Sequence, residues 1–210
     1  MTIETPSPEN IAGLILAGGR SSRMGRDKAA MMLSGRPMIG HVADRLMPQV
    51  ASLAVNALPG FAHHQILPVV ADTLENHQGP LAGILAGLRH FSAQGVHTHM
   101  ASAAGDGPFL PRDLVARLVA ACPDGETIAI AASEGHMHPV YALWPLALAD
   151  DLERWLTDPG NRRVKAFIAR HPNVTVSFEP EDTQAGLRDP FFNVNTPEDF
   201  ALAQTFLEQR

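Results

Sequence analysis

The sequence predicts an α/β protein built on a doubly wound, mostly parallel sheet with helices on both faces, folded as a single domain. Two observations lead to this prediction. Short apolar segments alternate with segments of helical periodicity, which is the order that generates parallel sheets. In addition, a glycine or a polar residue directly follows several of the apolar segments, and a parallel sheet would gather these positions along one edge.

Composition narrows the class of protein. The 210 residues are 45% hydrophobic and 18% charged, which is enough apolar content for one substantial core. We expect residues 1–10, which are polar and contain prolines, to form a flexible N-terminal tail, and residues 11–210 to form the domain. The net charge of −6 argues against nucleic-acid binding. Without a secretory signal or an apolar run of about 20 residues, we expect a cytoplasmic protein that does not bind membranes.

The first half of the chain alternates strands and helices. Strands are expected where apolar residues run without interruption, and helices where apolar residues recur every three or four positions or where a proline opens the segment. In chain order these rules predict a strand over 11–17, a helix over 37–47, strands over 52–56 and 66–71, a helix over 81–91 and a strand over 99–104.

The second half continues the alternation with one change. Two strands follow each other without a helix between them, and prolines open the first and last helices. The predicted elements are a helix over 111–121, strands over 127–132 and 139–143, helices over 146–156 and 163–170, a strand over 173–178, an extended segment over 192–195 and a final helix from Pro197 to 209.

The loop after the first strand carries the clearest chemical signal. Glycine exposes backbone N–H groups to an anion, and basic side chains neutralise phosphate charge. The loop combines both kinds of residue: Gly18, Gly19 and Gly25 with Arg20, Arg23, Arg26 and Lys28. It is neither a Walker A loop nor a G-x-G-x-x-G fingerprint. A plain turn with solvated arginines is the alternative, but the combination favours a loop that holds a nucleoside triphosphate.

Polar residues at the ends of later strands point to the same edge. Asn56, Asp72 and Asp106 each end or follow a predicted strand, so a parallel sheet would bring them near Gly18 and Gly19. Each of them could instead cap a turn or a helix. Asp106 lies between two glycines, where a carboxylate can reach a Mg²⁺ ion. We find no compelling Ser/His/Asp or Cys/His arrangement, which fits direct attack by a substrate phosphate.

Several motifs together resemble one family. Residues 16–28 read L-A-G-G-x-S-x-R-M-G-x-D-K, residues 79–84 read G-P-L-A-G-I, residues 138–141 read H-P-V-Y, and residues 193–199 read N-V-N-T-P-E-D. In this order they are similar to the molybdenum cofactor guanylyltransferase (MobA-type) family of Rossmann-like nucleotidyltransferases. Taken alone, the second motif could be a helix entry and the last a helix cap.

The resemblance implies a reaction. It implies transfer of GMP from GTP to the phosphate of molybdopterin, or of molybdenum-molybdopterin, with Mg²⁺ bound and pyrophosphate released. The product is a guanine dinucleotide cofactor. Transient contact with a molybdoenzyme or a molybdenum cofactor chaperone would accompany this role.

The resemblance also implies roles for individual residues. In the nucleotide site these are Leu16, Ala17, Gly18, Gly19, Lys28, Asn56, Asp72, Gly79, Pro80, Leu81 and Asp106, with Asn56 and Asp72 on the guanosine. Arg23, Lys28 and Asp106 would be catalytic, and Asp106 would hold Mg²⁺. His138 would face the acceptor, and Asn193 and Asn195 would lie in the environment of the acceptor or of the metal. A basic patch at 161–165 would either contact the anionic acceptor or a partner, or form a solvated helix face.

Two departures leave questions open. Gly105 and Gly107 flank Asp106 where the family usually reads C-D-x-P, so the rigidity of this loop is in doubt. Gly18 leaves room for a purine, whereas a sister group that transfers CMP tends to have L-A-A-G at this loop. A CTP-using cytidylyltransferase, another small nucleotidyltransferase and a non-catalytic nucleotide-binding regulatory module remain the alternatives. Loss of Lys28 or Asp106 would favour the last, but both are present.

Overall fold

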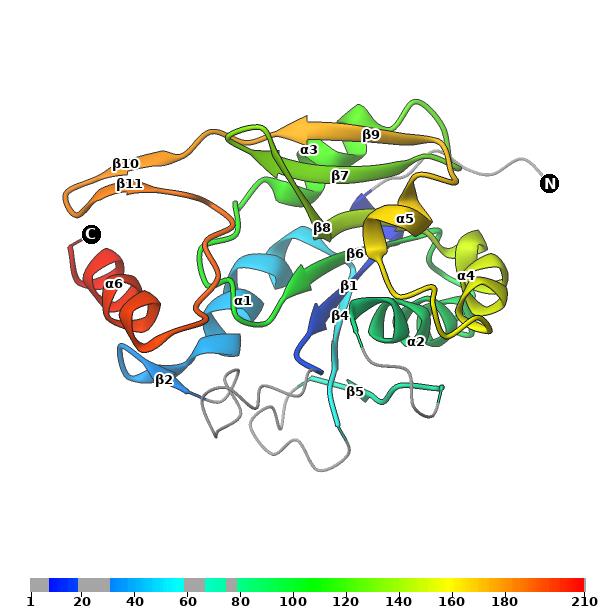
Figure 1. Cartoon of the computed structure of the whole chain (residues 1–210), viewed down its shortest axis with the longest axis horizontal. Coiled ribbons are helices and arrows are strands. Elements are labelled where there is room, and N and C mark those ends of the chain that lie inside the picture. Colours follow the sequence, from blue (N-terminus) through cyan, green and yellow to red (C-terminus); the bar gives the residue numbers. More distant parts are fainter. Residues whose placement is uncertain (1–7, 19–30, 59–66, 75–78, 210) are drawn as a thin grey trace.

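A computed structural model of the chain describes residues 8–18, 31–58, 67–74 and 79–209 (Figure 1). Its centre is a seven-stranded sheet in the order β5-β4-β1-β6-β8-β7-β9. The strands are β1 (Ile11–Leu16), β4 (Ser52–Asn56), β5 (Val69–Val70), β6 (His99–Ala104), β7 (Ile128–Ser133), β8 (His136–Pro145) and β9 (Asn173–Ser177). Neighbouring strands are parallel except that β8 runs antiparallel to both β6 and β7.

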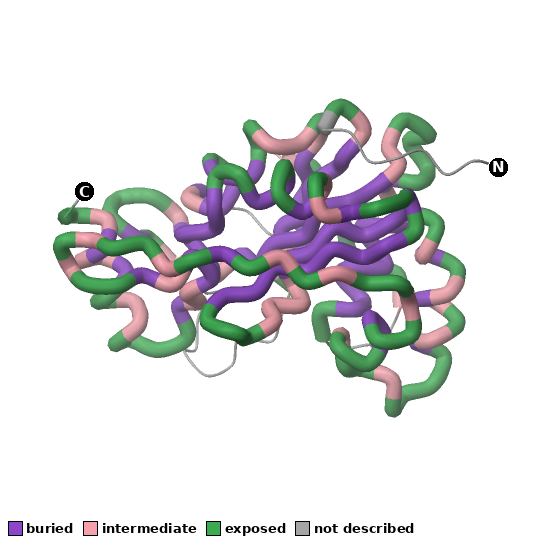
Figure 2. The backbone as a smooth tube through the Cα atoms, turned by 90° about the horizontal axis from the view of Figure 1, so that it is seen from above, coloured by how far each residue is buried: buried purple, intermediate pink, exposed green. Residues whose placement is uncertain are grey.

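Helices cover both faces of this sheet, as the sequence predicts. One face packs against α1 (Met38–Leu46) and α3 (Leu114–Ala121). The other packs against α2 (Pro80–Ser92), α4 (Ala149–Leu156) and α5 (Val164–Ile168). Figure 2 shows the resulting three layers, with the buried backbone concentrated in the central strands. The doubly wound α/β fold is therefore confirmed, with β8 as its antiparallel strand.

The central strands are built from small and apolar residues because they are covered on both faces. Every residue of β6 is buried, including Ser102. The Ser102 hydroxyl donates to the carbonyl of Val140 at 2.7 Å and accepts from Nε1 of Trp144 at 2.9 Å. This buried hydroxyl is thus satisfied, as burial of a polar group requires.

A smaller assembly, made of the C-terminal elements and one hairpin from the first half of the chain, extends the molecule at one end (Figure 1). It contains two short hairpins and the last helix: β2 (Met32–Leu33), β3 (Arg36–Pro37), β10 (Glu181–Thr183), β11 (Gly186–Arg188) and α6 (Pro197–Glu208). Its own apolar cluster includes Leu33, Phe109, Val194 and Phe206. This cluster fixes the path of the chain that leads past the sheet edge into α6.

Some predicted bounds were wrong for identifiable reasons. The predicted strand over 66–71 reduces to Val69–Val70 among the described residues. The helix predicted from residue 111 begins at Leu114, because Pro111 accepts a turn hydrogen bond from Leu114. The strand predicted over 139–143 extends over His136–Pro145.

Other segments differ in kind from the prediction. Residues 146–148 form a 3-10 turn before α4. Of the expected N-terminal tail, Pro8–Asn10 form a 3-10 turn and residues 1–7 lie outside the described part. Within the described residues, no helix is long and apolar enough to cross a membrane.

Two helical glycines give a test of this packing. A Cβ added to Gly87 in α2 would lie 2.5 Å from Leu14 Cδ2 and 2.6 Å from Met100 Sδ, whereas one added to Gly40 in α1 would meet no atom of the described residues nearer than 3.9 Å. Gly87→Ala should therefore lower the free energy of unfolding by about 1–2 kcal/mol through overpacking. Gly40→Ala should raise it by about 0.5–1 kcal/mol through helix propensity. Urea unfolding of both variants checks this, and equal effects would contradict the packing.

Candidate active site

The carboxyl ends of β1, β4 and β5 meet, and the buried side chain of Asn56 connects them. The backbone N–H of Ala17 donates to the carbonyl of Asn56 at 2.9 Å. Nδ2 of Asn56 donates to the carbonyl of Val70 at 3.0 Å and to Oδ1 of Asp72 at 2.8 Å. Asn56 is 2% exposed, whereas Asp72 is exposed to solvent. The structure thus brings Gly18, Asn56 and Asp72 together, as their positions at strand ends predict.

Two glycines make room for the amide of Asn56. A Cβ on Gly18 would lie 2.9 Å from Oδ1 of Asn56, and a Cβ on Gly83 in α2 would lie only 2.2 Å from it. The space beside Gly18 therefore faces this amide oxygen. The absence of a side chain at Gly18 is thus explained by the Asn56 amide, and no longer by itself indicates a purine base. Gly83 was missed as a site residue, although it lies within the G-P-L-A-G-I motif.

The start of α2 positions the rest of that motif. Gly79 has φ of 121°, in the region that favours glycine, and Pro80 occupies the first turn of the helix. Both are exposed to solvent. Leu81 is 1% exposed and packs in the core beneath α2, so its side chain supports the helix.

The loop after β6 lies against the end of β1. The N–H of Gly105 donates to the carbonyl of Leu16 at 3.0 Å, and a Cβ on Gly105 would lie 3.2 Å from that same oxygen. Asp106 follows directly and is partly exposed. The backbone that carries Asp106 therefore lies next to Leu16 and Ala17, where the candidate nucleotide loop begins. The glycine before Asp106 is explained by this close approach.

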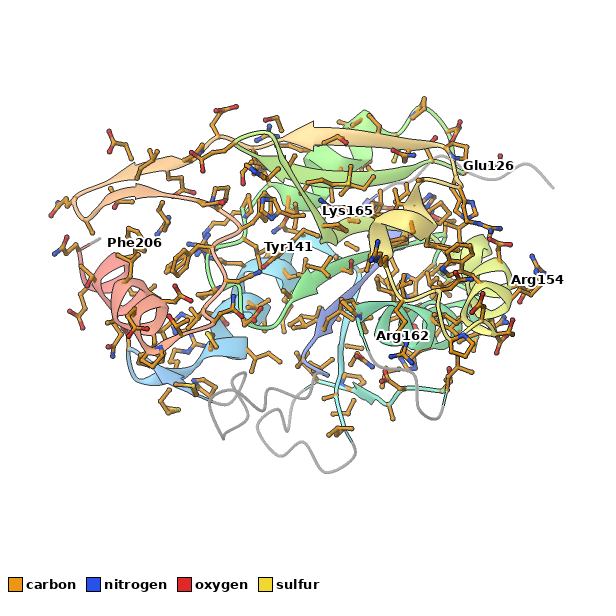
Figure 3. All side chains as sticks on the ribbon, in the orientation of Figure 1. Glu126, Tyr141, Arg154, Arg162, Lys165 and Phe206 are labelled. Atoms are coloured by element: carbon orange, nitrogen blue, oxygen red, sulfur yellow. The ribbon has the colours of Figure 1, made fainter. Side chains whose placement is uncertain are left out.

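On the other side of Asp106, the buried Tyr141, which is labelled in Figure 3, joins two loops. The hydroxyl of Tyr141 on β8 donates to Oδ1 of Asn193 at 2.9 Å. The N–H of Val194 donates to the carbonyl of Asp106 at 2.9 Å. Burial, followed by the charges of Asp106 and Asp189, raises the pKa of Tyr141 well above its usual value. Asp106 and Asn193 are thus brought together, and Tyr141 is a site neighbour that sequence reasoning missed despite its place in the H-P-V-Y motif.

His138 belongs to a polar chain at the same edge. The hydroxyl of Ser133 donates to Oδ1 of Asp189 at 2.9 Å, so it accepts from Nε2 of His138 at 2.7 Å. The neutral imidazole therefore carries its proton on Nε2. Burial is the main cause that lowers the pKa of His138, while Asp189 acts in the opposite direction. No sequence signal linked Ser133 to Asp189, because 56 positions separate them.

Asn195 takes part in the hydrogen bonds at the start of α6, whatever its role toward a ligand. Thr196 is the N-cap of α6, and Asp199 completes a capping box with it. The backbone N–H of Asn195 also donates to Oδ2 of Asp199, at 2.8 Å. The interpretation of the last motif as a helix cap is therefore confirmed, with Thr196 as the cap, and Asn195 lies exposed where the chain enters the helix.

Some predicted residues lie outside the described part of the chain: Gly19, Arg23 and Lys28. In the described ranges there is no group of three or more His, Cys, Asp or Glu side chains that could hold a metal ion. A resident metal cage is thus not seen among these residues. A carboxylate that shares Mg²⁺ with substrate phosphates needs no such cage.

Residues 13–174 match the family described as MobA-like NTP transferase domain. The chain belongs to this family. It is therefore an enzyme of the nucleotidyltransferase class, which confirms the resemblance seen in the sequence motifs.

Named relatives of this MobA-like protein cover almost its whole length. A protein from Rhizobium meliloti (strain 1021), "Molybdenum cofactor guanylyltransferase", is 51% identical over 197 residues, covering 92% of this chain and 90% of its own. One of the same name from Sinorhizobium fredii is 48% identical, covering 100% and 97%. The solved "Molybdopterin-guanine dinucleotide biosynthesis protein A" from Archaeoglobus fulgidus has a TM-score of 0.73 at 24% identity, covering 95% of this chain and 100% of that one. This last likeness shows a shared fold.

The hydrogen bond between Asn56 and Asp72 can be tested through the pH dependence of stability in a variant. Asn56→Asp would place a buried carboxylate beside Asp72 Oδ1 and the Val70 carbonyl, and remove the donor that both accept from. The repulsion raises the folded-state pKa of the pair above its unfolded value, so the penalty is present at high pH and shrinks as pH falls. We expect a loss of about 2–4 kcal/mol of stability at pH 8 and a smaller loss at pH 5.

The reversed pair is the matched control for this experiment. Asn56→Asp combined with Asp72→Asn keeps one carboxylate and one amide, so it should recover part of the loss at pH 8. Thermal unfolding at both pH values measures the effect. Wild-type stability of Asn56→Asp at pH 8 would show that the Asn56–Asp72 contact is not formed.

Proposed function

We propose that this MobA-type protein transfers GMP from GTP to the phosphate of molybdopterin, or of its molybdenum-bound form. Pyrophosphate leaves and molybdopterin guanine dinucleotide cofactor forms. The observation that carries the proposal is near-50% identity, over nearly the full length of both chains, to relatives named for this activity. The polar residues gathered at the strand ends support it, because they offer separate surfaces for a nucleotide and for an acceptor.

The nucleotide side is formed by the ends of β1, β4 and β5. Asp72 presents an exposed carboxylate, whose Oδ1 is held by Asn56 at 2.8 Å. Such a carboxylate accepts hydrogen bonds from N–H and O–H groups, which guanosine supplies at its base and ribose. The backbone of Leu16, Ala17 and Gly18 leads directly into the glycine-rich loop. The phosphates would lie along that loop, with Lys28 neutralising their charge.

Asp106 is the residue that would hold Mg²⁺. Asp106 follows the end of β6, its loop lies against the end of β1 where the triphosphate would begin, and the residue is partly open to solvent. Mg²⁺ prefers one or two carboxylates together with phosphate oxygens, so this single carboxylate fits the ion. When bound, the metal neutralises charge on the phosphates of GTP and on the leaving pyrophosphate. Arg23 would add positive charge at the transferred phosphate.

The acceptor side is formed by β8 and by the loop before α6. His138, Asn193 and Asn195 would contact the acceptor, and they present an imidazole and two amides at this edge. An oxygen of the acceptor phosphate attacks the α-phosphorus of GTP. The new P–O bond forms as the bond to the β-phosphate bridging oxygen breaks, and pyrophosphate leaves with that electron pair. The protein's part is positioning and charge stabilisation, so no nucleophilic side chain is required.

The reaction can be tested with two nucleotides in parallel. Purified protein, molybdopterin and Mg²⁺ are incubated with GTP or with CTP, and the dinucleotide product is measured by mass. We expect product with GTP and at least about tenfold less with CTP, as a site built to hydrogen-bond one base rejects another. Product only with CTP would overturn the base assignment and favour a cytidylyltransferase. No product with either nucleotide would overturn the proposed transfer.

The role of Asp106 has a separate test. Asp106→Asn keeps the shape of the side chain but removes the charge that would face Mg²⁺, so kcat should fall by about 100-fold or more. GTP binding should remain measurable by calorimetry. Asp113→Asn is the control, because Asp113 is exposed and its ion pair to Arg117 spans 4.0 Å. Unchanged turnover of Asp106→Asn at saturating Mg²⁺ would remove Asp106 from the mechanism.

A further inference from the structure

The hydroxyl of Tyr141 occupies an unusual position between two loops of the site. Tyr141 is fully buried in β8, and its hydroxyl donates to Oδ1 of Asn193 at 2.9 Å. A Cβ added to Gly107 would lie 1.8 Å from this hydroxyl and 3.0 Å from Oδ1 of Asn193. The hydroxyl therefore fills the space that a side chain at position 107 would need.

This contact explains why a glycine follows Asp106. The φ angle of Gly107 lies outside the left-handed region, so its backbone conformation does not require glycine. The missing Cβ instead lets the tyrosine hydroxyl reach the backbone of the Asp106 loop. The same loop accepts a hydrogen bond from the N–H of Val194, at 2.9 Å, through the carbonyl of Asp106. One hydroxyl thus contacts both the loop of Asp106 and the loop of Asn193.

The hydrogen bond also sets the direction of the Asn193 amide. An amide has an acceptor end, Oδ1, and a donor end, Nδ2. Tyr141 donates to Oδ1, so the two N–H groups of Nδ2 form the other end of the side chain. Among the described residues, no protein hydrogen bond from Nδ2 of Asn193 is formed. An N–H group can donate to a phosphate oxygen but cannot coordinate Mg²⁺, so this end of the amide suits the acceptor phosphate.

We propose that Tyr141 is a positioning residue, which turns the Asn193 amide so that its N–H groups face the phosphate of the acceptor. Gly107 is the position that makes this arrangement possible. The inference rests on the proposed function, since it assigns Asn193 to the acceptor phosphate within that same site. It adds a specific geometry, namely that the tyrosine hydroxyl and the glycine act as a pair.

The first test separates acceptor binding from nucleotide binding. Tyr141→Phe removes only the hydroxyl, so the amide of Asn193 loses its fixed direction. We expect the KM for molybdopterin to rise by about fivefold to tenfold, which corresponds to one lost hydrogen bond. The KM for GTP should stay within about twofold of the wild-type value.

Ser102→Ala is the matched control for this variant. It also removes a buried hydroxyl from the sheet, and it leaves Nε1 of Trp144 without its acceptor. It should lower the melting temperature without changing either KM. If Tyr141→Phe behaves in the same way, with both KM values unchanged, the tyrosine is merely structural and the proposal is overturned.

The second test does not depend on activity. Gly107→Ala should lower the melting temperature by about 5 °C or more, because the new methyl group would overlap the tyrosine hydroxyl. In the Tyr141→Phe background the same change should cost less than about half as much. The rescue is partial because Cζ of Tyr141 lies 3.0 Å from the added Cβ. Equal losses in both backgrounds would overturn the pairing.

The two tests also distinguish this inference from the proposed function. If the wild-type protein makes no dinucleotide with molybdopterin and either nucleotide, the proposed function fails, and the assignment of Asn193 to the acceptor fails with it. The melting-temperature cycle would still decide whether Tyr141 and Gly107 act as a pair. If the wild-type protein is active, the KM values of Tyr141→Phe decide the role of Tyr141.

Discussion

The nucleotide side of the site depends on one buried amide. Asn56 is 2% exposed, and its Nδ2 satisfies the Val70 carbonyl and Asp72 while its Oδ1 faces Gly18 and Gly83. A buried polar side chain must find its partners within the protein, so the ends of three strands and the start of α2 are constrained together. Both glycines follow from this constraint, since a side chain at either position would displace the amide oxygen.

The acceptor side repeats the same principle with a different group. Here a tyrosine hydroxyl occupies the space of an absent Cβ at Gly107 and directs the amide of Asn193. In each half of the site, a glycine without positive φ admits a polar atom that holds a neighbouring group in place. These glycines therefore contribute precise positioning, which is a different role from the flexibility usually ascribed to glycine-rich loops.

Sequence reasoning reached the fold and the strand-end residues because both are local patterns. Apolar runs and helical periodicity identified most elements. The rule that the carboxyl ends of parallel strands share one edge predicted that Asn56 and Asp72 lie close together, and the structure shows them in contact. The short hairpins at 32–37 and 181–188 were missed, since they carry too few residues for periodicity. The contacts of Ser133 with Asp189 and of Tyr141 with Asn193 join positions more than 50 apart. They depend on how β8 and the chain before α6 cross the sheet edge, which no local pattern encodes.

The direction of β8 explains why residues from the ends of parallel strands and residues from a reversed strand can both lie near Asp106. In a parallel sheet only the carboxyl ends of strands reach the binding edge. A turn at Glu134 and Gly135, both with positive φ, reverses the chain, so β8 begins at this edge and runs away from it. Its pairing with β6, from Ser102 opposite Ala142 to His99 opposite Pro145, leaves His138 and Tyr141 beside the end of β6. Asp106 therefore lies between a parallel half, suited to the nucleotide, and a reversed strand that supplies the acceptor side.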